Sequence, residues 1–191
     1  MINIQYVTDK LDKDFINEIL EIDASVYPEH LQGTFEEVYG RFCANRDMFV
    51  LLYDDKKLIG YLCLFPVKDA MYEQITGENK LFDSDIPGEM LEQYKPHNEY
   101  KLYLISMVIL PEYQKKGLSK HLIKGFYNFM LEKKKNNISF SVILSSAVTD
   151  DGKQMLERMG FKEKKKLPGG YSLNELVIND AFYQTAERKR K

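Results

Sequence analysis

The sequence predicts one α/β (α+β) domain built around a mixed, mostly antiparallel central sheet. Its 191 residues are a usual length for a single domain. Residues 48–65 contain two apolar strand patterns separated by a short polar turn, which is typical of an antiparallel hairpin. An apolar strand at 102–110, a loop, a helix and a strand at 138–144 then follow, and this order indicates a parallel crossover. We expect the domain to span residues 1–180 and a basic tail to occupy 181–191.

Two helices are predicted before the hairpin. Residues 2–7 alternate like a short strand, and Asp12 is placed to cap the helix that follows. In that helix four apolar residues and one acid recur at helical spacing: Phe15, Ile16, Ile19, Leu20 and Asp23. Thr34 and Glu37 have the spacing of a capping box, which predicts that a second helix begins at residue 35.

Residues 68–97 interrupt the regular pattern. They contain turn-forming residues and short helical patches, and they are too long for an ordinary connection between strands. They also carry seven acidic and three basic side chains, a local net charge of −4. We expect an excursion from the sheet that is either functional or mobile.

The C-terminal half alternates helices and strands. A helix is predicted from about 117 to 134, and a shorter one is ended by Gly160. Strands at 164–167 and 173–178 close the sheet, and the charged residues 187–191 are expected to fray.

The composition excludes several classes of function. Hydrophobic residues make up 44% and charged residues 29%, the balance of a folded globule. The net charge of −2 argues against a dedicated nucleic-acid-binding domain. Cys43, Cys63 and three scattered histidines show neither disulfide nor metal-ligand spacing, so we expect no metal. Because neither a signal peptide nor a run of 18 apolar residues is present, we expect a cytoplasmic protein without a membrane partner.

The loop between the apolar strand and the long helix is the most informative segment for function. The first amides of a helix have no partner within the helix, and the helix dipole attracts anions to that end. Gly117 allows the backbone to approach a ligand closely, while Lys115 and Lys116 add positive charge. These features predict a phosphate or pyrophosphate site. The alternative is an ordinary strand-to-helix turn with lysines for solubility.

The same loop resembles the Gln/Arg-x-x-Gly-x-Gly/Ala motif of the GNAT superfamily of acyl-CoA-dependent N-acetyltransferases. The residues that carry the resemblance are Gln114, Lys115, Lys116, Gly117, Leu118 and Ser119. Ser119 stands where the family prefers glycine or alanine.

A second segment, residues 149–161, resembles a later block of the family and matches it at Glu157, Gly160 and Phe161. Thr149 stands where asparagine is common. Leu156 stands where many members carry a tyrosine that protonates the leaving thiolate, which puts a tyrosine-acid mechanism in doubt.

The resemblance implies a fold in which helices cover both faces of the sheet and the parallel fourth and fifth strands splay apart. Acetyl-CoA would be the co-substrate, with pantetheine in the gap between these strands. Backbone groups of Met107, Val108 and Ile109 would bind it and polarise the thioester, the loop amides of 114–119 would hold the pyrophosphate, and Thr149 would join the cofactor site. The acceptor amine would attack the thioester directly in a ternary complex, without a covalent enzyme intermediate.

A base is required because an alkyl amine is largely protonated at neutral pH. The candidates are Tyr103 and Glu99, four residues apart on one face of the entering strand. The resemblance places Tyr103 where other members have a base or a water-binding side chain. Packing against the sheet explains Tyr103 equally well, and a solvated strand end explains Glu99 better.

The expected acceptor is a primary amine of a small molecule or peptide. The acidic residues 68–97 favour a cationic amine, although a solvated loop explains them too. Four tyrosines are candidates for an acceptor pocket: Tyr27, Tyr72, Tyr94 and Tyr100. A rival function is a non-catalytic acyl-CoA-binding sensor, which Leu156 keeps open. A third and more remote possibility is association with RNA, which is suggested only by the lysines at 164–166 and the basic tail.

Overall fold

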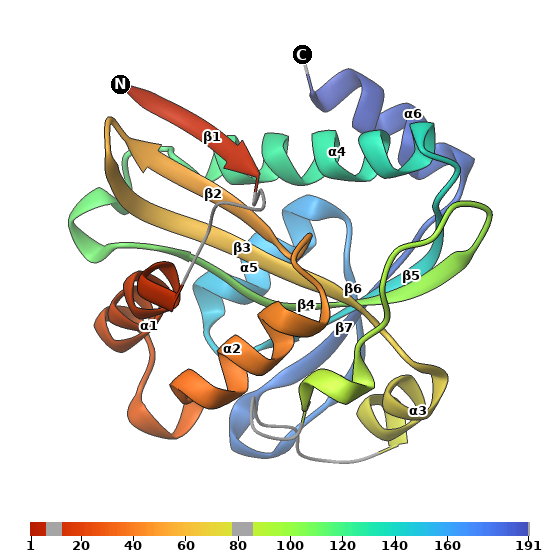
Figure 1. The fold of residues 1–191 in the computed structure, drawn as a ribbon, viewed down its shortest axis with the longest axis horizontal. Coiled ribbons are helices and arrows are strands. Elements are labelled where there is room, and N and C mark those ends of the chain that lie inside the picture. Colours follow the sequence, from red (N-terminus) through yellow and green to blue (C-terminus); the bar gives the residue numbers. More distant parts are fainter. Residues whose placement is uncertain (7–12, 78–85, 191) are drawn as a thin grey trace.

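A computed structural model describes residues 1–6, 13–77 and 86–190 of the chain (Figure 1). Within them, seven strands form one sheet in the order β1-β2-β3-β4-β5-β7-β6, and β4 and β5 are the parallel pair. The predicted mixed, mostly antiparallel sheet is therefore confirmed. The strands are β1 (Ile2–Tyr6), β2 (Phe49–Asp54), β3 (Lys57–Val67), β4 (Glu99–Ile109), β5 (Ser139–Ala147), β6 (Lys162–Lys166) and β7 (Ser172–Val177).

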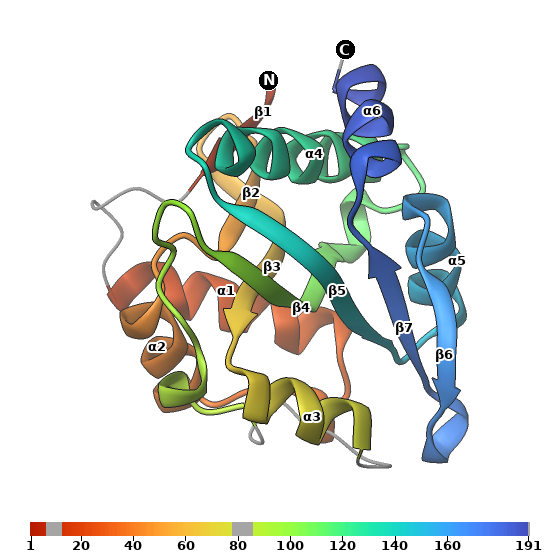
Figure 2. The same cartoon turned by 90° about the vertical axis from the view of Figure 1, so that its right-hand side faces the viewer.

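Helices cover both faces of this sheet (Figure 2). Consecutive β3 residues such as Leu62 and Cys63 belong to opposite buried clusters, as the alternation of a strand requires. One cluster packs under α4 (Ser119–Lys135), α5 (Asp150–Met159) and α6 (Asp180–Lys189). The other packs against α1 (Lys13–Val26), α2 (Phe35–Ala44) and α3 (Asp69–Gly77).

The local signals for helix ends correspond to observed caps. The Thr34 hydroxyl accepts a hydrogen bond from the Glu37 amide at 3.3 Å, and the Glu37 carboxylate accepts one from the Thr34 amide at 2.8 Å. This is the predicted capping box at the start of α2. Gly160 ends α5 with a φ of 98°, a left-handed conformation that favours glycine. The cap expected at Asp12 lies outside the described residues.

The parallel strands β4 and β5 form a fork. Their pairing begins at Glu99, and its last pair joins Tyr103 to Leu144. Beyond that point β4 continues along β3, and β5 continues along β7. Ile105 is left without a partner in the β3–β4 register, so β4 bulges where the two strands part. A bulge bends its strand and increases its twist, which helps to open the fork.

The predicted excursion at 68–97 is folded against the body of the protein where the structure describes it. Its first part is α3, whose Met71 and Ile75 are buried, and a short 3-10 turn follows at Gly88–Met90. Several of its charged residues lie outside the described part of the chain: Glu78, Lys80, Asp83 and Asp85.

The chain end differs from the expected basic tail. Residues 180–189 form α6, whose first turn is capped by the Asn179 side chain, which accepts from the Phe182 amide. Phe182 and Ala186 are buried against α4. The two apolar positions are separated by polar residues, and this thin stripe is a weak signal in the sequence. Of the two free cysteines in the described chain, Cys43 is exposed and Cys63 is buried.

Replacing Phe182 with alanine tests whether α6 belongs to the domain. The Phe182 ring lies 6.1 Å from that of Phe126 and 5.9 Å from that of Tyr127. We expect Phe182→Ala to lower the free energy of unfolding by about 3 kcal/mol and Tm by roughly 6–12 °C. Gln184→Ala, at an exposed position of the same helix, is the matched control. Equal melting temperatures for both variants would contradict the packing of α6.

Candidate active site

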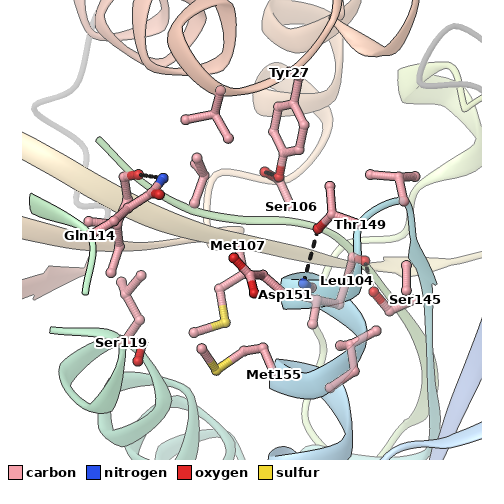
Figure 3. Close-up of a pocket in the computed structure, with 18 of the residues that line it drawn as sticks. Tyr27, Leu104, Ser106, Met107, Gln114, Ser119, Ser145, Thr149, Asp151 and Met155 are labelled. Carbon is pink, nitrogen blue, oxygen red and sulfur yellow. Dashed lines mark hydrogen bonds between the residues drawn. The ribbon is translucent and has the colours of Figure 1, made fainter. Parts of the chain in front are cut away.

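The fork between β4 and β5 opens into a cavity of about 700 Å³ (Figure 3). Its walls come from β4, β5, the end of α1, the loop after β4, the first turn of α4, and α5. Side chains alternate along β4, so the cavity has one end on the α4 and α5 face of the sheet and another on the α1 face. A volume of this size suits an extended organic ligand.

At the α4 end, the loop after β4 presents unused backbone amides. Lys115 and Gly117 both have left-handed backbones, with φ of 58° and 71°. Side chains cap α2, α5 and α6, but none caps α4. Within the described chain, the amides of residues 115–118 donate no hydrogen bond. Successive free amides at a helix start form a concavity that binds anions.

Two contacts fix this loop to the sheet. The Gln114 side-chain amide donates to the carbonyl of Ile109, the last residue of β4, at 2.8 Å. Lys57 of β3 forms a 3.0 Å ion pair with Glu112. Gln114 therefore holds the loop in place, and its side chain is already engaged.

The β4 edge along the fork forms the middle of the cavity. Met107, Val108 and Ile109, the residues that the resemblance assigned to the cofactor, all line it. The Ser145 hydroxyl donates to the Leu104 carbonyl at 2.8 Å, at the point where the ladder ends. Figure 3 shows the side chain of Met107 facing Met155 of α5 across the cavity.

The predicted loop residues divide into two groups. Gln114, Lys115, Gly117, Leu118 and Ser119 line the cavity. Lys116 does not, because its ammonium lies 5.2 Å from the centre of the Tyr113 ring.

The α1 end of the cavity is lined with hydroxyl groups. Tyr103 donates to the Ser146 hydroxyl of β5 at 3.1 Å. The hydroxyls of Tyr27 and Ser106 also lie 3.1 Å apart. Of the predicted catalytic pair, Tyr103 therefore lies in the cavity, whereas Glu99 is exposed at the start of β4 and does not line it. Of the four candidate tyrosines, Tyr27 lines the cavity and the others do not.

Asp23 also lines this end, and sequence reasoning did not select it. It lies in the last turns of α1 on the same face as Ile16 and Ile19, and its exposed fraction is 7%. The hydroxyl of Tyr61 on β3 donates to its carboxylate. Burial, followed by the charge of Asp23, raises the pKa of Tyr61 well above its usual value, so this phenol stays a donor. In the sequence, the signal for Asp23 was an acidic residue at helical spacing among apolar residues.

A family model described as the Acetyltransferase (GNAT) family matches residues 15–161, which include the fork, the loop and α5. The chain belongs to the GNAT acetyltransferase family. No curated protein sequence matches it. Among the described residues of this GNAT protein, no cluster of three or more His, Cys, Asp or Glu could hold a metal, and no helix is long and apolar enough to cross a membrane.

Solved structures share the fold of this GNAT protein at low sequence identity. The loading GNATL domain of CurA from Lyngbya majuscula has a TM-score of 0.67 at 15% identity, covering 93% of this chain and 98% of that one. PH1933 from Pyrococcus horikoshii OT3 has a TM-score of 0.64 at 19% identity, covering 94% and 99%. Naa50 from Arabidopsis thaliana, in complex with the bisubstrate analogue CoA-Ac-MVNAL, has a TM-score of 0.60 at 11% identity, covering 93% and 99%.

Thr149 and Leu156 are two of the positions at which this GNAT protein departs from the family pattern. Thr149 caps α5, and its hydroxyl accepts from the Gly152 amide at 3.0 Å at the rim of the cavity. Leu156 lines the cavity with an apolar side chain that is 5% exposed. Leu156 therefore supplies no hydroxyl group to the cavity, whereas Tyr103 and Ser146 supply two.

Proposed function

We propose that this protein transfers an acetyl group from acetyl-CoA to a primary amine by direct attack in a ternary complex. The observation that carries the proposal is that the fork and the free loop amides open into one cavity. The family of the chain supports acetyl transfer, and the complex of Naa50 with a CoA-linked analogue supports CoA as the acyl carrier.

The residues at the two ends of the cavity suit different parts of the reaction. The amides of residues 115–118, with Lys115 beside them, complement a pyrophosphate. The β4 edge at residues 107–109 suits pantetheine, and an amide there would stabilise the negative charge that develops on the thioester oxygen. The Tyr103–Ser146 hydroxyl pair lies on the acceptor side, where a proton is needed by the departing thiolate. Glu99 has no part in this proposal, because it lies outside the cavity.

Acetyl-CoA is expected to raise the melting temperature of the protein. A ligand that binds only the folded state at about 100 times its Kd adds ~2.7 kcal/mol. For a chain of this length, that free energy corresponds to a rise in Tm of roughly 5–11 °C. Differential scanning fluorimetry measures the shift, with free adenosine as a control that lacks the pyrophosphate. No binding at millimolar acetyl-CoA would contradict the cofactor site.

A non-catalytic acyl-CoA sensor is the second candidate, favoured by the apolar Leu156 in the cavity wall. Both functions predict acetyl-CoA binding. Release of free thiol with a panel of primary amines separates them. Binding without turnover above the uncatalysed rate for any amine would favour the sensor.

A further inference from the structure

We infer that Asp23 binds the acceptor as a primary ammonium and accepts its proton, and that the acceptor carries this group on an apolar arm. The inference rests on the proposed acetyl transfer and names the substrate class of the same cavity. It stands on the position, burial and surroundings of one carboxylate.

Asp23 reaches the cavity because of its position in the helix. Ile16 and Ile19 bury this face of α1 against the sheet, and Asp23 continues the same stripe toward the fork. Tyr27, one turn later, extends to Ser106 of β4 and places a second polar contact beside it. The carboxylate therefore lies on the α1 side of β4, opposite the loop that suits the pyrophosphate.

A carboxylate is a costly choice for a purely structural contact at this site. Burying an ionised group costs several kcal/mol unless it is paired and hydrogen-bonded. An amide side chain could also accept the Tyr61 hydroxyl, in a weaker hydrogen bond but without that cost. A carboxylate has about four acceptor positions, so it can accept from Tyr61 and still accept from an ammonium. Placed in a cavity wall, it suits a cationic ligand.

The surrounding wall indicates what the ammonium is attached to. Among the described residues that line the α1 end, Asp23 is the acidic one. Val26, Leu31 and Ile105 add apolar surface beside it, and Ser25, Tyr27 and Ser106 add hydroxyl groups. No described residue of 68–97 lines the cavity, so the described acids of that segment add nothing to this charge. One carboxylate beside this apolar surface, with no second acid among the described residues at this end, suits a monoamine with an apolar arm better than a polycation.

The proton balance of the reaction accounts for the role of Asp23. An alkyl ammonium must lose two protons to become an amide. Asp23 accepts the first, which frees the nitrogen lone pair to attack the thioester carbonyl, and later passes it to solvent. The nitrogen–carbon bond then forms, the carbon–sulfur bond breaks, and the second proton ends on the thiol of CoA.

The test compares Asp23→Asn with wild type on two nucleophiles. Phenethylamine is protonated at neutral pH, whereas hydroxylamine is neutral and needs no base before attack. With acetyl-CoA saturating, we expect Asp23→Asn to lower kcat/KM for phenethylamine by about 100-fold or more, in the range for general base catalysis. The loss with hydroxylamine should be less than about tenfold, and the KM for acetyl-CoA should be unchanged. Asp23→Glu should recover part of the activity.

Glu21→Gln is the matched control, since it removes the same charge from an exposed position of α1. It should behave as wild type. Equal losses for the two nucleophiles in Asp23→Asn would assign Asp23 a structural role and overturn the inference. Wild-type turnover of hydroxylamine without turnover of phenethylamine or hexylamine would overturn the apolar-arm class.

A measurement on the wild type keeps the inference testable if Asp23→Asn does not fold. Phenethyltrimethylammonium should compete with the acceptor at least about tenfold more strongly than its neutral analogue 2-phenylethanol, because only the cation pairs with a carboxylate. Equal inhibition would overturn the ammonium site. Failure of the wild type to release thiol with any amine, hydroxylamine included, would instead overturn the proposed acetyl transfer itself.

Discussion

Replacing Gly117 with valine will abolish the rise in Tm that acetyl-CoA produces. The φ of 71° at this position is one that a β-branched residue adopts only with strain, at a cost of roughly 1–2 kcal/mol. Relief of that strain turns the amides of residues 115–118 away from their common direction. A Cβ at Gly117 meets nothing in the protein within 4 Å, so no internal clash adds to the cost and the fold should survive.

Gly170→Val separates loss of the ligand site from backbone strain. Gly170 also has a left-handed backbone, with a φ of 83°, and a Cβ there meets nothing within 4 Å. It lies in the β6–β7 turn and does not line the cavity. Both variants should melt lower than wild type by similar amounts, and Gly170→Val alone should keep the acetyl-CoA shift. A full shift in Gly117→Val would mean that the pyrophosphate does not lie on this loop.

The α4 end of the cavity, where we propose that the cofactor binds, was accessible to sequence reasoning because its parts are consecutive in the chain. One strand, one loop and one helix start supply the β4 edge and the free amides, so a local pattern contains most of the geometry. The capping box of α2 was predictable for the same reason, since Thr34 and Glu37 are one helical turn apart. The sequence could not show in which direction each side chain of the loop points. Lys116, for example, lies over the Tyr113 ring and does not line the cavity.

The α1 end of the cavity, where we propose that the acceptor binds, required the tertiary fold. Its hydrogen bonds join Asp23 to Tyr61 across 38 positions, Tyr103 to Ser146 across 43, and Tyr27 to Ser106 across 79. No local pattern brings these groups together. An acid within an apolar stripe is ambiguous in sequence, because it can equally mark the edge of the buried face.

The choice between Glu99 and Tyr103 shows a related limit. The alternation of a strand predicts that both residues share one face of β4. Four residues of extended chain nevertheless separate them by about 13 Å, and the fork opens only beyond Tyr103. Register alone does not say where two strands part. That point depends on the bulge at Ile105 and on the partners of β5.

Tyr103 belongs to the last residue pair between β4 and β5, and it lines the cavity. Its ring packs 6.2 Å from that of Phe65, which fixes the direction of the side chain. Its hydroxyl donates to Ser146 on the opposite arm of the fork. Because Leu156 offers no proton, we assign to this pair the delivery of a proton to the departing thiolate, under the proposed acetyl transfer.

Tyr103→Phe will therefore lower kcat by about tenfold or more, at or below the ~10²–10⁴ range typical of acid–base groups. Acetyl-CoA affinity should stay within a factor of about two, because only the hydroxyl is removed and the ring packing against Phe65 remains. Tyr100→Phe is the matched control. Its hydroxyl lies on the same strand but bonds the backbone of Gln93 and Lys95 outside the cavity, so this variant should lose stability and keep its kcat. Thiol release with phenethylamine or hydroxylamine measures both variants, and an unchanged kcat in Tyr103→Phe would remove this hydroxyl from the reaction.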